Sequence, residues 1–163
     1  MRIGIGHDTH AIAAKGPLIL GGVKIPADIH LVGHSDADVL LHAVTDALLG
    51  AAAIGDIGQL FPDSAPENRG RDSAEMLKVA YLQVRQCGYD LVNLDCIVFA
   101  EQPKLAPHRV AIQQRIAEIL DASPNQIGIK AKTGEGIGAV GHGRLMAAQC
   151  VALLQCQGRS ATD

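Results

Sequence analysis

An aspartate and a histidine two residues apart, Asp8 and His10, stand near the start of the chain. In an extended strand, residues two apart share one face, so a carboxylate oxygen and an imidazole nitrogen would converge there. His7 would point to the opposite face and is not expected to join them. Because this spacing is common, the pair alone favours a turn aspartate beside a surface histidine.

A second candidate, His42, lies between Asp38 and Asp46 at spacings of four residues, which would put the three side chains on one helical stripe. The surrounding residues are core-forming, which favours a structural histidine. The flanking carboxylates instead favour a metal ligand, because a metal-bound histidine usually donates its other N–H to a carboxylate. Together with Asp8 and His10, His42 would supply one oxygen and two nitrogens with a fourth position open, the pattern of a catalytic zinc site.

A glycine-rich stretch, Lys130–Gly138, carries two lysines, a threonine, a glutamate and three glycines. Such loops cradle phosphates through backbone N–H groups. The stretch is not a dinucleotide fingerprint, because Ala139 stands where the last glycine is needed, and it has no Walker G-K-[ST] sequence. A flexible hairpin is the commoner meaning of clustered glycines. His34, just before a predicted helix, could contact an anion at the helix N-terminus.

The composition excludes several classes of protein. The chain has 163 residues, 48% of them apolar, and a formal charge of −3, so it lacks the basic surface of a nucleic-acid-binding protein. Only four residues are aromatic, and no uncharged apolar run reaches the roughly 18 residues of a membrane span. We expect a cytoplasmic protein whose cysteines are buried, reduced thiols. The cysteines are Cys87, Cys96, Cys150 and Cys156.

The elements that must position these residues follow from apolar patterning and turn signals. The predicted strands are Arg2–His7, Leu18–Gly21, Val23–Pro26, Leu91–Ala100 and Ile127–Thr133. The predicted helices are Asp36–Ala53, capped by Ser35, then a helix from Asp72 that Gly88 ends, and His108–Asp121. Gly55–Arg71 is expected to be a long loop, and Leu145–Leu154 fits either a helix or a strand. This mixture predicts a single α+β domain over residues 1–157, with a short tail at 158–163.

Five motifs occur in an order that resembles the 2-C-methyl-D-erythritol 2,4-cyclodiphosphate synthase family, from Met1 to about Leu154. They are Asp8-Thr9-His10; His34-Ser35-Asp36-Ala37-Asp38 leading to His42; Gly55-Asp56-Ile57-Gly58 with Phe61-Pro62-Asp63; Pro103-Lys104-Leu105 with Pro107-His108; and Lys130 to Gly136. The resemblance implies a compact domain with a mixed four-stranded-type sheet, helices packed on one face and Leu145–Leu154 as a strand. It also implies a homotrimer with active sites between adjacent subunits.

The resemblance further implies an enzyme of non-mevalonate isoprenoid biosynthesis, a phosphorus–oxygen lyase. Its substrate would be the nucleotide diphosphate 4-diphosphocytidyl-2-C-methyl-D-erythritol 2-phosphate. The 2-phosphate attacks the β-phosphorus and CMP leaves, giving the cyclic diphosphate. The implied cofactors are Zn²⁺ and a second divalent cation, Mg²⁺ or Mn²⁺, and no nucleic acid or membrane takes part.

The resemblance assigns roles to individual positions. Asp8, His10 and His42 match the zinc ligands, Glu135 the ligand of the second ion, and His34 and Thr133 the catalytic groups that steady the transition state. The matching substrate contacts are Asp8, His10, His34, Ser35, Asp56, Ile57, Gly58, Phe61, Pro62, Asp63, Ser64, Ala65, Ala100, Pro103, Lys104, Leu105, Ala106, Lys132, Thr133, Gly134, Glu135 and His142. Ala100–Ala106 contains no Trp or Tyr, so backbone groups and aliphatic walls would hold the cytosine.

The chain departs from the family at Ala139, His142 and Arg144, where members commonly have Phe, Arg and Glu. In the family these positions lie near the threefold axis, where some members bind an isoprenoid diphosphate. Two alternatives use the same three ligands. One is a zinc-dependent phosphoesterase that activates a bound water, and the other is a non-catalytic zinc- or nucleotide-binding trimer.

Overall fold

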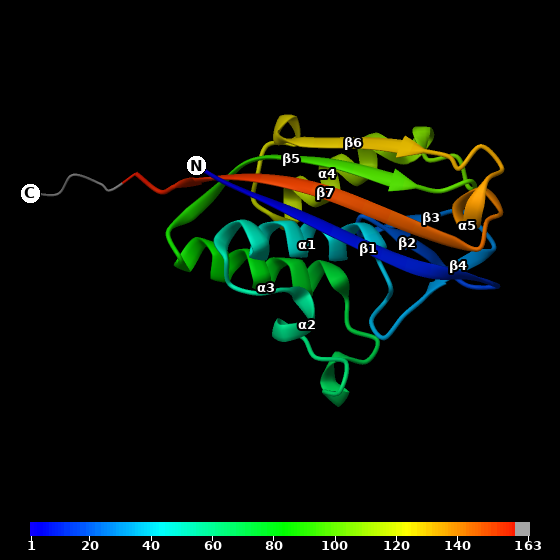
Figure 1. Cartoon of the computed structure of the whole chain (residues 1–163), viewed down its shortest axis with the longest axis horizontal. Coiled ribbons are helices and arrows are strands. Elements are labelled where there is room, and N and C mark those ends of the chain that lie inside the picture. The colour runs from blue at the N-terminus through cyan, green and yellow to red at the C-terminus, as the bar shows by residue number, and fades with distance from the viewer. Residues whose placement is uncertain (159–163) are drawn as a thin grey trace, which may run out of the picture.

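A mixed five-stranded sheet in the order β4-β1-β7-β5-β6 forms the centre of the chain (Figure 1). The computed structural model describes residues 1–158, so residues 159–163 of the expected tail lie outside it. The strands of this sheet are β1 (Arg2–Ala14), β4 (Ile29–Val32), β5 (Tyr89–Phe99), β6 (Ile127–Lys132) and β7 (Leu145–Cys156). β5 and β6 pair in parallel, and the other neighbours are antiparallel. A separate hairpin joins β2 (Leu18–Leu20) to β3 (Val23–Ile25), as the two glycines between them predict.

The expectation of a four-stranded sheet is wrong by one strand. β1 does not end at His7 but continues to Ala14, and its second half pairs with β4. The polar residues that follow His7 hide this continuation, because they break the apolar pattern that identifies a strand. The extension places Asp8 and His10 inside regular strand geometry.

The segment that fitted either a helix or a strand forms β7, as the resemblance implies. β7 lies between β1 and β5 and is hydrogen-bonded to both along most of its length. A strand paired on both sides has one face toward the helices and one away from them. The helix-facing residues Cys150, Ala152 and Leu154 are fully buried, whereas Val151 and Leu153 between them are partly exposed.

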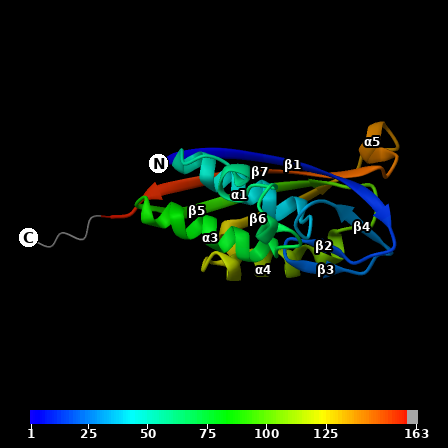
Figure 2. The ribbon, with the colours of Figure 1, turned by 90° about the horizontal axis from the view of Figure 1, so that it is seen from below.

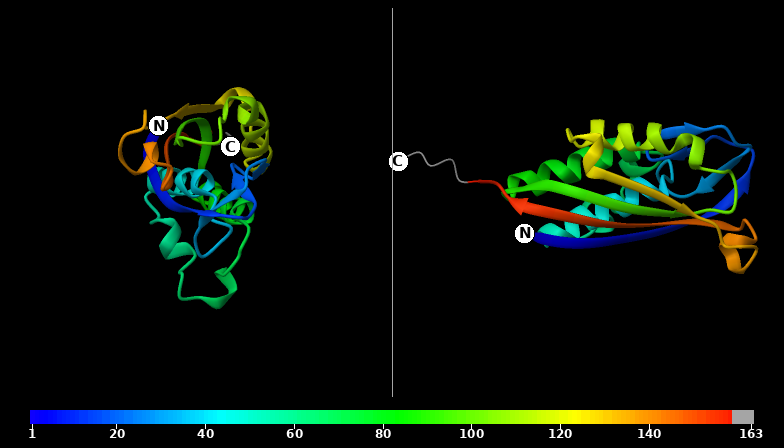
Figure 3. Two further views of the ribbon diagram at one scale, coloured as in Figure 1. Left: turned by 90° about the vertical axis from the view of Figure 1, so that its right-hand side faces the viewer. Right: turned by 90° about the horizontal axis from the view of Figure 1, so that it is seen from above.

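Three helices cover one face of the sheet: α1 (Val39–Ala52), α3 (Ser73–Gln86) and α4 (Arg109–Ile119) (Figures 2 and 3). Asp38 rather than Ser35 caps α1, because its carboxylate accepts the N–H groups of Leu40 and Leu41. Asp72 caps α3, and Gly88 follows its end with a positive φ of 84°, as predicted. The expected loop Gly55–Arg71 contains two short helical turns, α2 (Ile57–Leu60) and η1 (Pro66–Asn68), and projects from the body of the molecule (Figure 1). The remaining short turns are η2 (Ala106–His108), η3 (Pro124–Gln126) and α5 (Gly138–Gly141).

Two glycines let β1 lie unusually close to α1. A Cβ atom on Gly6 would lie 2.0 Å from the Ala43 carbonyl oxygen, and one on Gly4 would lie 2.1 Å from that of Ala47. Only glycine leaves room for backbone at such distances. This contact fixes the strand that carries Asp8 and His10 against the helix that carries His42.

The opposite face of the sheet is not covered by any described element. Its apolar residues include Ile3 and Ile5, which are 72% and 63% exposed, and their register partners Leu153 and Val151. Large exposed apolar surfaces are typical of sites where proteins interact.

The four cysteines are free thiols, but they are not all buried as expected. Cys96 and Cys150 face each other across β5 and β7 in the core, whereas Cys87 and Cys156 are exposed at element ends. The neighbouring Cys96 thiol and burial raise the pKa of Cys150, which keeps it protonated. Among residues 1–158, no helix is both long and apolar enough to cross a membrane.

Candidate active site

Asp8, His10 and His42 converge at the end of α1 nearest β4. The Asp8 Oδ2 atom lies 3.0 Å from His10 Nε2 and 2.9 Å from His42 Nδ1, and the two ring nitrogens are 3.2 Å apart. The three residues form a group that could hold a metal ion. The strand and helix spacings that suggested this set are therefore confirmed as a three-dimensional arrangement.

Strand alternation separates these ligands from the other polar residues of β1. Asp8 and His10 point toward α1, whereas His7 points to the open face and its Nε2 lies 3.2 Å from Thr9 Oγ1. The expectation that His7 lies outside the ligand set is confirmed for this reason. Asp8 also accepts the Thr9 N–H through Oδ1, which leaves Oδ2 directed at the two histidines.

The geometry fits a tetrahedral metal ion. Ligand bonds of 2.0–2.1 Å at tetrahedral angles put neighbouring ligand atoms about 3.3 Å apart, close to the separations of Asp8, His10 and His42. One carboxylate oxygen and two imidazole nitrogens suit zinc and related transition metals. The Nδ1–H of His10 donates to the Val32 carbonyl at 2.8 Å, which leaves its Nε2 bare and directed at the group.

The group is electrostatically coupled. Partial burial by itself would raise the pKa of Asp8, but hydrogen bonds and charge from His10 and His42 outweigh it and hold that pKa far below its ordinary value. Burial by itself would lower the pKa of His10, but the Asp8 carboxylate outweighs it and the net shift is upward. An ionised Asp8 oxygen therefore lies beside both imidazoles and gives the group a negative charge that attracts a cation.

Hydroxyl groups, and not the flanking aspartates, contact the far side of His42. Its Nε2 lies 2.9 Å from Ser73 Oγ and 3.0 Å from Ser35 Oγ. Asp38 is instead buried as the cap of α1, where it also accepts the N–H groups of the glycines between β2 and β3. Asp46 accepts the Ile57 N–H at 2.8 Å and so anchors α2. The predicted helix therefore carries all three polar residues, but neither aspartate is a hydrogen-bond partner of His42.

A pocket of about 280 Å³ opens beside the metal-binding group. Its residues come from the turn before α1, from α1 itself, from the loop that contains α2 and from α3. The pocket lining is Gly33, His34, Ser35, His42, Ile57, Gly58, Phe61, Asp63, Asn68 and Met76. Several predicted substrate contacts therefore lie around one cavity, namely His34, Ser35, Ile57, Gly58, Phe61 and Asp63.

Side-chain contacts within the projecting loop shape the wall of this pocket. The Arg71 guanidinium lies over the Phe61 ring at 4.8 Å and donates to Asn68 Oδ1 at 3.0 Å. The Asn68 amide in turn donates to the Pro62 carbonyl at 3.0 Å. The loop is tied to the turn before α1 by the Gly70 N–H, which donates to the His34 carbonyl. These contacts hold Phe61 and Asn68 at the cavity.

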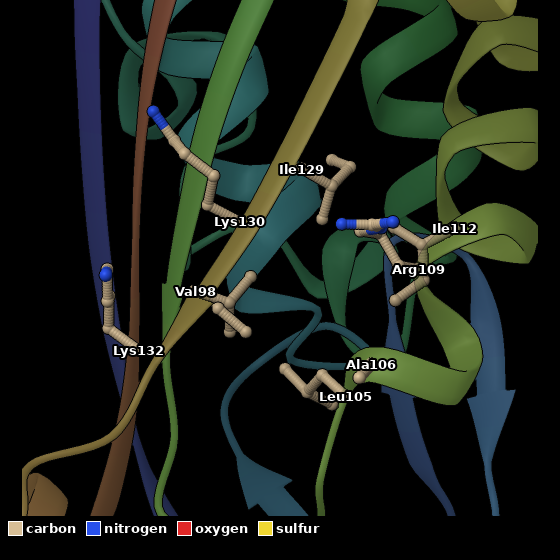
Figure 4. Close-up of a pocket in the computed structure, with 9 residues that line it drawn as sticks. Val98, Leu105, Ala106, Arg109, Ile112, Ile129, Lys130 and Lys132 are labelled. Carbon is tan, nitrogen blue, oxygen red and sulfur yellow. The ribbon is translucent and has the colours of Figure 1, made fainter.

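A second pocket, of about 310 Å³, lies between α4 and the parallel pair β5 and β6 (Figure 4). Leu105 and Ala106, expected at the cytidine, and Lys132, expected at the diphosphate end, are the predicted contacts in its lining. The other lining residues are Val98, Arg109, Ile112, Ile129, Lys130 and Ala131. The lining contains no aromatic side chain, in keeping with the expected aliphatic walls. In Figure 4 the Lys130 and Lys132 side chains extend away from α4, whereas Arg109 reaches toward β6.

Other predicted contacts belong to the same chain segments as the pocket residues without lining either pocket. Asp56 caps α2 by accepting the Gln59 N–H, and Pro62, Ser64 and Ala65 follow in the same loop. The Ala100 N–H donates to the Lys132 carbonyl where β5 and β6 end. Pro103 and Lys104 precede Leu105 in the connection to η2.

The glycine-rich loop is separate from the metal-binding group in this chain. Thr133 donates through Oγ1 to Glu135 Oε1 at 2.9 Å, and the Gly134 N–H donates to Glu101 Oε2 at 3.0 Å. Glu135 is not part of the group formed by Asp8 and its partners, and His142 follows α5 at the other end of the loop. The loop is compact, because a Cβ on Gly134 would lie 2.3 Å from the Gly141 nitrogen.

Three residues at these sites were not found by sequence reasoning: Ser73, Asn68 and Arg109. Ser73 follows a helix cap and has the composition of an ordinary first helical turn. Asn68 lies in a loop whose fold was not predicted, and Arg109 opens a helix whose solvent-facing side carries several charges. Ser73 and Arg109 lie beside segments distant in sequence, for which a single sequence gives no spacing signal, whereas the contacts of Asn68 depend on the fold of its own loop.

The fold and the site together define an α+β protein with a metal-binding group beside a ligand pocket. The chain belongs to the YgbB family, whose model matches residues 1–155. A relative from Rhodopirellula baltica, named 2-C-methyl-D-erythritol 2,4-cyclodiphosphate synthase, is 51% identical over 94% of this chain and 92% of its own.

Solved structures agree with this assignment. The chain matches the bifunctional IspDF of Campylobacter jejuni with a TM-score of 0.92 and 42% identity, over 95% of this chain and 42% of that one. It matches IspF from Plasmodium falciparum, described as a CDP complex, with a TM-score of 0.85 and 35% identity over 96% and 97% of the two chains. The compact α+β domain and the enzyme family implied by the sequence motifs are therefore confirmed.

Proposed function

We propose that this chain catalyses the conversion of 4-diphosphocytidyl-2-C-methyl-D-erythritol 2-phosphate to 2-C-methyl-D-erythritol 2,4-cyclodiphosphate with release of CMP. The observation that carries the proposal is the Asp8, His10 and His42 group opening onto a pocket lined by His34, Ser35 and other predicted contacts. Relatives at about 50% identity carry the synthase name. The enzyme is a phosphorus–oxygen lyase of non-mevalonate isoprenoid biosynthesis.

The chemistry requires alignment more than proton removal. The 2-phosphate is ionised at neutral pH, so one of its oxygens can attack the β-phosphorus without a strong base. The bond from the β-phosphorus to the CMP oxygen breaks, and CMP leaves with the bonding electrons. The protein must therefore hold attacking and leaving oxygens in line and neutralise charge on the phosphoryl group.

Asp8, His10 and His42 would hold Zn²⁺, which supplies Lewis-acid stabilisation of phosphoryl charge when bound. Glu135 would hold the second divalent cation, Mg²⁺ or Mn²⁺. His34, at the pocket wall, and Thr133, at the end of β6, would steady the transition state.

The substrate would span the two pockets. The methylerythritol phosphate would lie beside Ser35, Asp56, Gly58 and the loop to Ala65. The cytidine would occupy the aliphatic pocket near Pro103, Lys104, Leu105 and Ala106, with Lys132–Glu135 and His142 toward the diphosphate end. The aliphatic lining around Leu105 supports this, since it can hold a base without a stacking partner.

A homotrimer would bring the pockets together. In one chain the metal-binding group lies against β1 and the second pocket against β6, three strand spacings or roughly 14 Å away across the sheet. The uncovered apolar face around Ile5 and Val151 supports assembly through the sheet. We expect residues 1–157 to act as one catalytic domain in the cytoplasm, where free thiols persist.

The test is to incubate the purified protein with the substrate, Zn²⁺ and Mg²⁺ and to follow the products by phosphorus NMR. We expect CMP and a cyclic diphosphate to appear together. The His42→Ala variant should lose turnover and zinc while the assembly persists. Linear phosphates that carry oxygen from labelled water would identify a hydrolase, and no turnover despite bound zinc would identify a binding protein; either result contradicts the proposal.

A further inference from the structure

The Nε2 atom of His42 faces two serine hydroxyls, and one of them has a fixed direction. Ser73 Oγ lies 2.9 Å from Nε2 and is also hydrogen-bonded to Asp36 Oδ1. A carboxylate only accepts hydrogen bonds, so the single Ser73 proton goes to Asp36. Ser73 Oγ must then accept from His42, and His42 Nε2 must carry the proton.

We infer that Ser73, held by Asp36, is a positioning residue that presents His42 to the metal with Nδ1 bare. The inference rests on the proposed function in that it takes the group of Asp8, His10 and His42 as the zinc site. Ser73 touches neither metal nor substrate and acts through the His42 ring.

Asp36 is itself fixed, which makes the chain of hydrogen bonds rigid. Its Oδ2 accepts the Ser73 N–H at 3.2 Å and its Oδ1 accepts the Asp38 N–H at 3.3 Å. Its own N–H donates to the Arg71 carbonyl at 3.1 Å. Asp36 therefore links the start of α1 to the start of α3, and Ser73, which is 1% exposed, has no access to water as an alternative partner.

Ser35 does not have the same role, although its Oγ is 3.0 Å from His42 Nε2. That oxygen accepts the Ala37 N–H at 3.1 Å, and its hydroxyl proton has no carboxylate partner. Ser35 also lines the pocket, where the proton can turn toward a ligand. The direction of the His42 proton is therefore set by Ser73.

His10 provides an internal comparison. Its Nδ1–H donates to a backbone carbonyl, that of Val32, which fixes the opposite tautomer and leaves Nε2 for the metal. Both ring nitrogens at the metal site, His10 Nε2 and His42 Nδ1, are thus left bare by a partner on the other side of the ring. Removing such a partner typically weakens metal affinity by roughly 10- to 100-fold.

The experiment measures zinc affinity by competition with a chromophoric chelator in the full chain. We expect Ser73→Ala to raise the zinc dissociation constant at least about tenfold, and Asp36→Asn to raise it by a smaller factor, because the amide can still accept from Ser73. The matched control is Thr45→Val, which removes another buried hydroxyl from the same region; Thr45 donates to the Leu41 carbonyl and does not contact His42. The control should keep the wild-type affinity.

Long-range proton–nitrogen NMR of zinc-loaded wild-type protein gives a second readout that needs no variant. It should show His42 protonated at Nε2 and bound through Nδ1. A wild-type ring bound through Nε2, or a folded Ser73→Ala protein with unchanged zinc affinity, overturns the inference. If the wild-type protein binds no zinc, both this inference and the assignment of the metal site are overturned. If it binds zinc but forms no cyclic product, only the proposed function is contradicted.

Discussion

Residue 33 is a glycine, and the His10 ring occupies the space where a larger residue would place its Cβ atom. A Cβ on Gly33 would lie 2.8 Å from His10 Cε1 and 3.1 Å from Nδ1. We expect Gly33→Ala to displace the ring, break its hydrogen bond to Val32 and weaken zinc binding about tenfold. Chelator competition measures the change.

The control for this substitution is Gly50→Ala, at an exposed position of α1. A Cβ there would meet only the Ile5 carbonyl oxygen, at 3.9 Å. Since alanine favours a helix over glycine, the control should keep its zinc affinity and gain about 0.5 kcal/mol of stability. Equal zinc affinities of Gly33→Ala and wild type would show that the ring tolerates the added atom.

Asp46 gives a prediction on pH dependence. Burial raises the pKa of its carboxyl above the ordinary value, although its hydrogen bond from Ile57 opposes the shift. Because the folded-state pKa is the higher one, the wild-type protein is most stable with Asp46 protonated and loses this contribution as the pH rises through that pKa. The amide introduced by Asp46→Asn can keep the acceptor without the charge.

We therefore expect the free energy of unfolding of Asp46→Asn to match wild type below the ordinary pKa of about 3.9, to exceed it as the pH rises above that value, and to keep a constant excess once the pH is above the folded-state pKa. Urea unfolding at several pH values measures the difference. A variant that is less stable than wild type near neutral pH would show that the charge itself supports α2.

At the level of single residues, the sequence predicted ligands better than the groups that support them. Asp8, His10 and His42 were found because strand and helix periods act within one element. The partner of His42 was not found, since Ser73 reaches it from another helix. Asp38 and Asp46 had the spacing expected of carboxylate partners for His42, but Asp38 caps α1 and Asp46 anchors α2.

Among elements, the contact between β1 and α1 determines the geometry of the metal site. Gly6 packs on the Ala43 carbonyl, and any side chain there would push the strand away from the helix. We expect Gly6→Ala to destabilise the fold by about 2 kcal/mol or more, as overpacking does, and to weaken zinc binding in the protein that remains folded. Thermal unfolding and zinc titration test both effects, with Gly50→Ala as the control.

A Gly6→Ala protein as stable as wild type would mean that β1 can shift without cost. In that case the zinc affinity of the variant would show whether Asp8 and His10 still lie close enough to His42 to bind one metal ion. If Gly6→Ala kept both the stability and the zinc affinity of wild type, the close contact between β1 and α1 would be contradicted.

The elements themselves were largely predictable. The hairpin of β2 and β3, the caps of α3 and the strands β5 and β6 followed from local turn chemistry and apolar patterning. β4 and the second half of β1 did not, because their pairing is tertiary and functional residues such as Asp8 break the alternation. The identity of β7 also needed the family resemblance, since an apolar run fits a buried helix equally well.

For the whole molecule, the open face of the sheet predicts how the chain assembles. We expect Ile5→Asp to prevent trimer formation, because it puts a charge into the apolar face beside Val151. Light scattering after gel filtration measures the mass. The variant should still bind zinc, since all three ligands belong to one chain, but it should lose turnover.

The matched control is Leu82→Asp on α3, a similarly exposed apolar position on the helical side. It should remain trimeric and active. A trimeric Ile5→Asp protein would exclude the open face as the subunit contact.

The placement of the two pockets at different strands of one sheet has a consequence for mixed assemblies. If each site takes the metal-binding group from one chain and the β5–β6 pocket from its neighbour, two different lesions can complement each other. His42→Ala damages the first part, and Ala106→Trp would fill the second. Each variant alone should be inactive, yet random trimers of an equal mixture should regain about a quarter of wild-type activity. About one interface in four would combine an intact metal-binding group from one chain with an intact β5–β6 pocket from its neighbour. Mixing His42→Ala with Asp8→Ala, which damage the same half, should restore none.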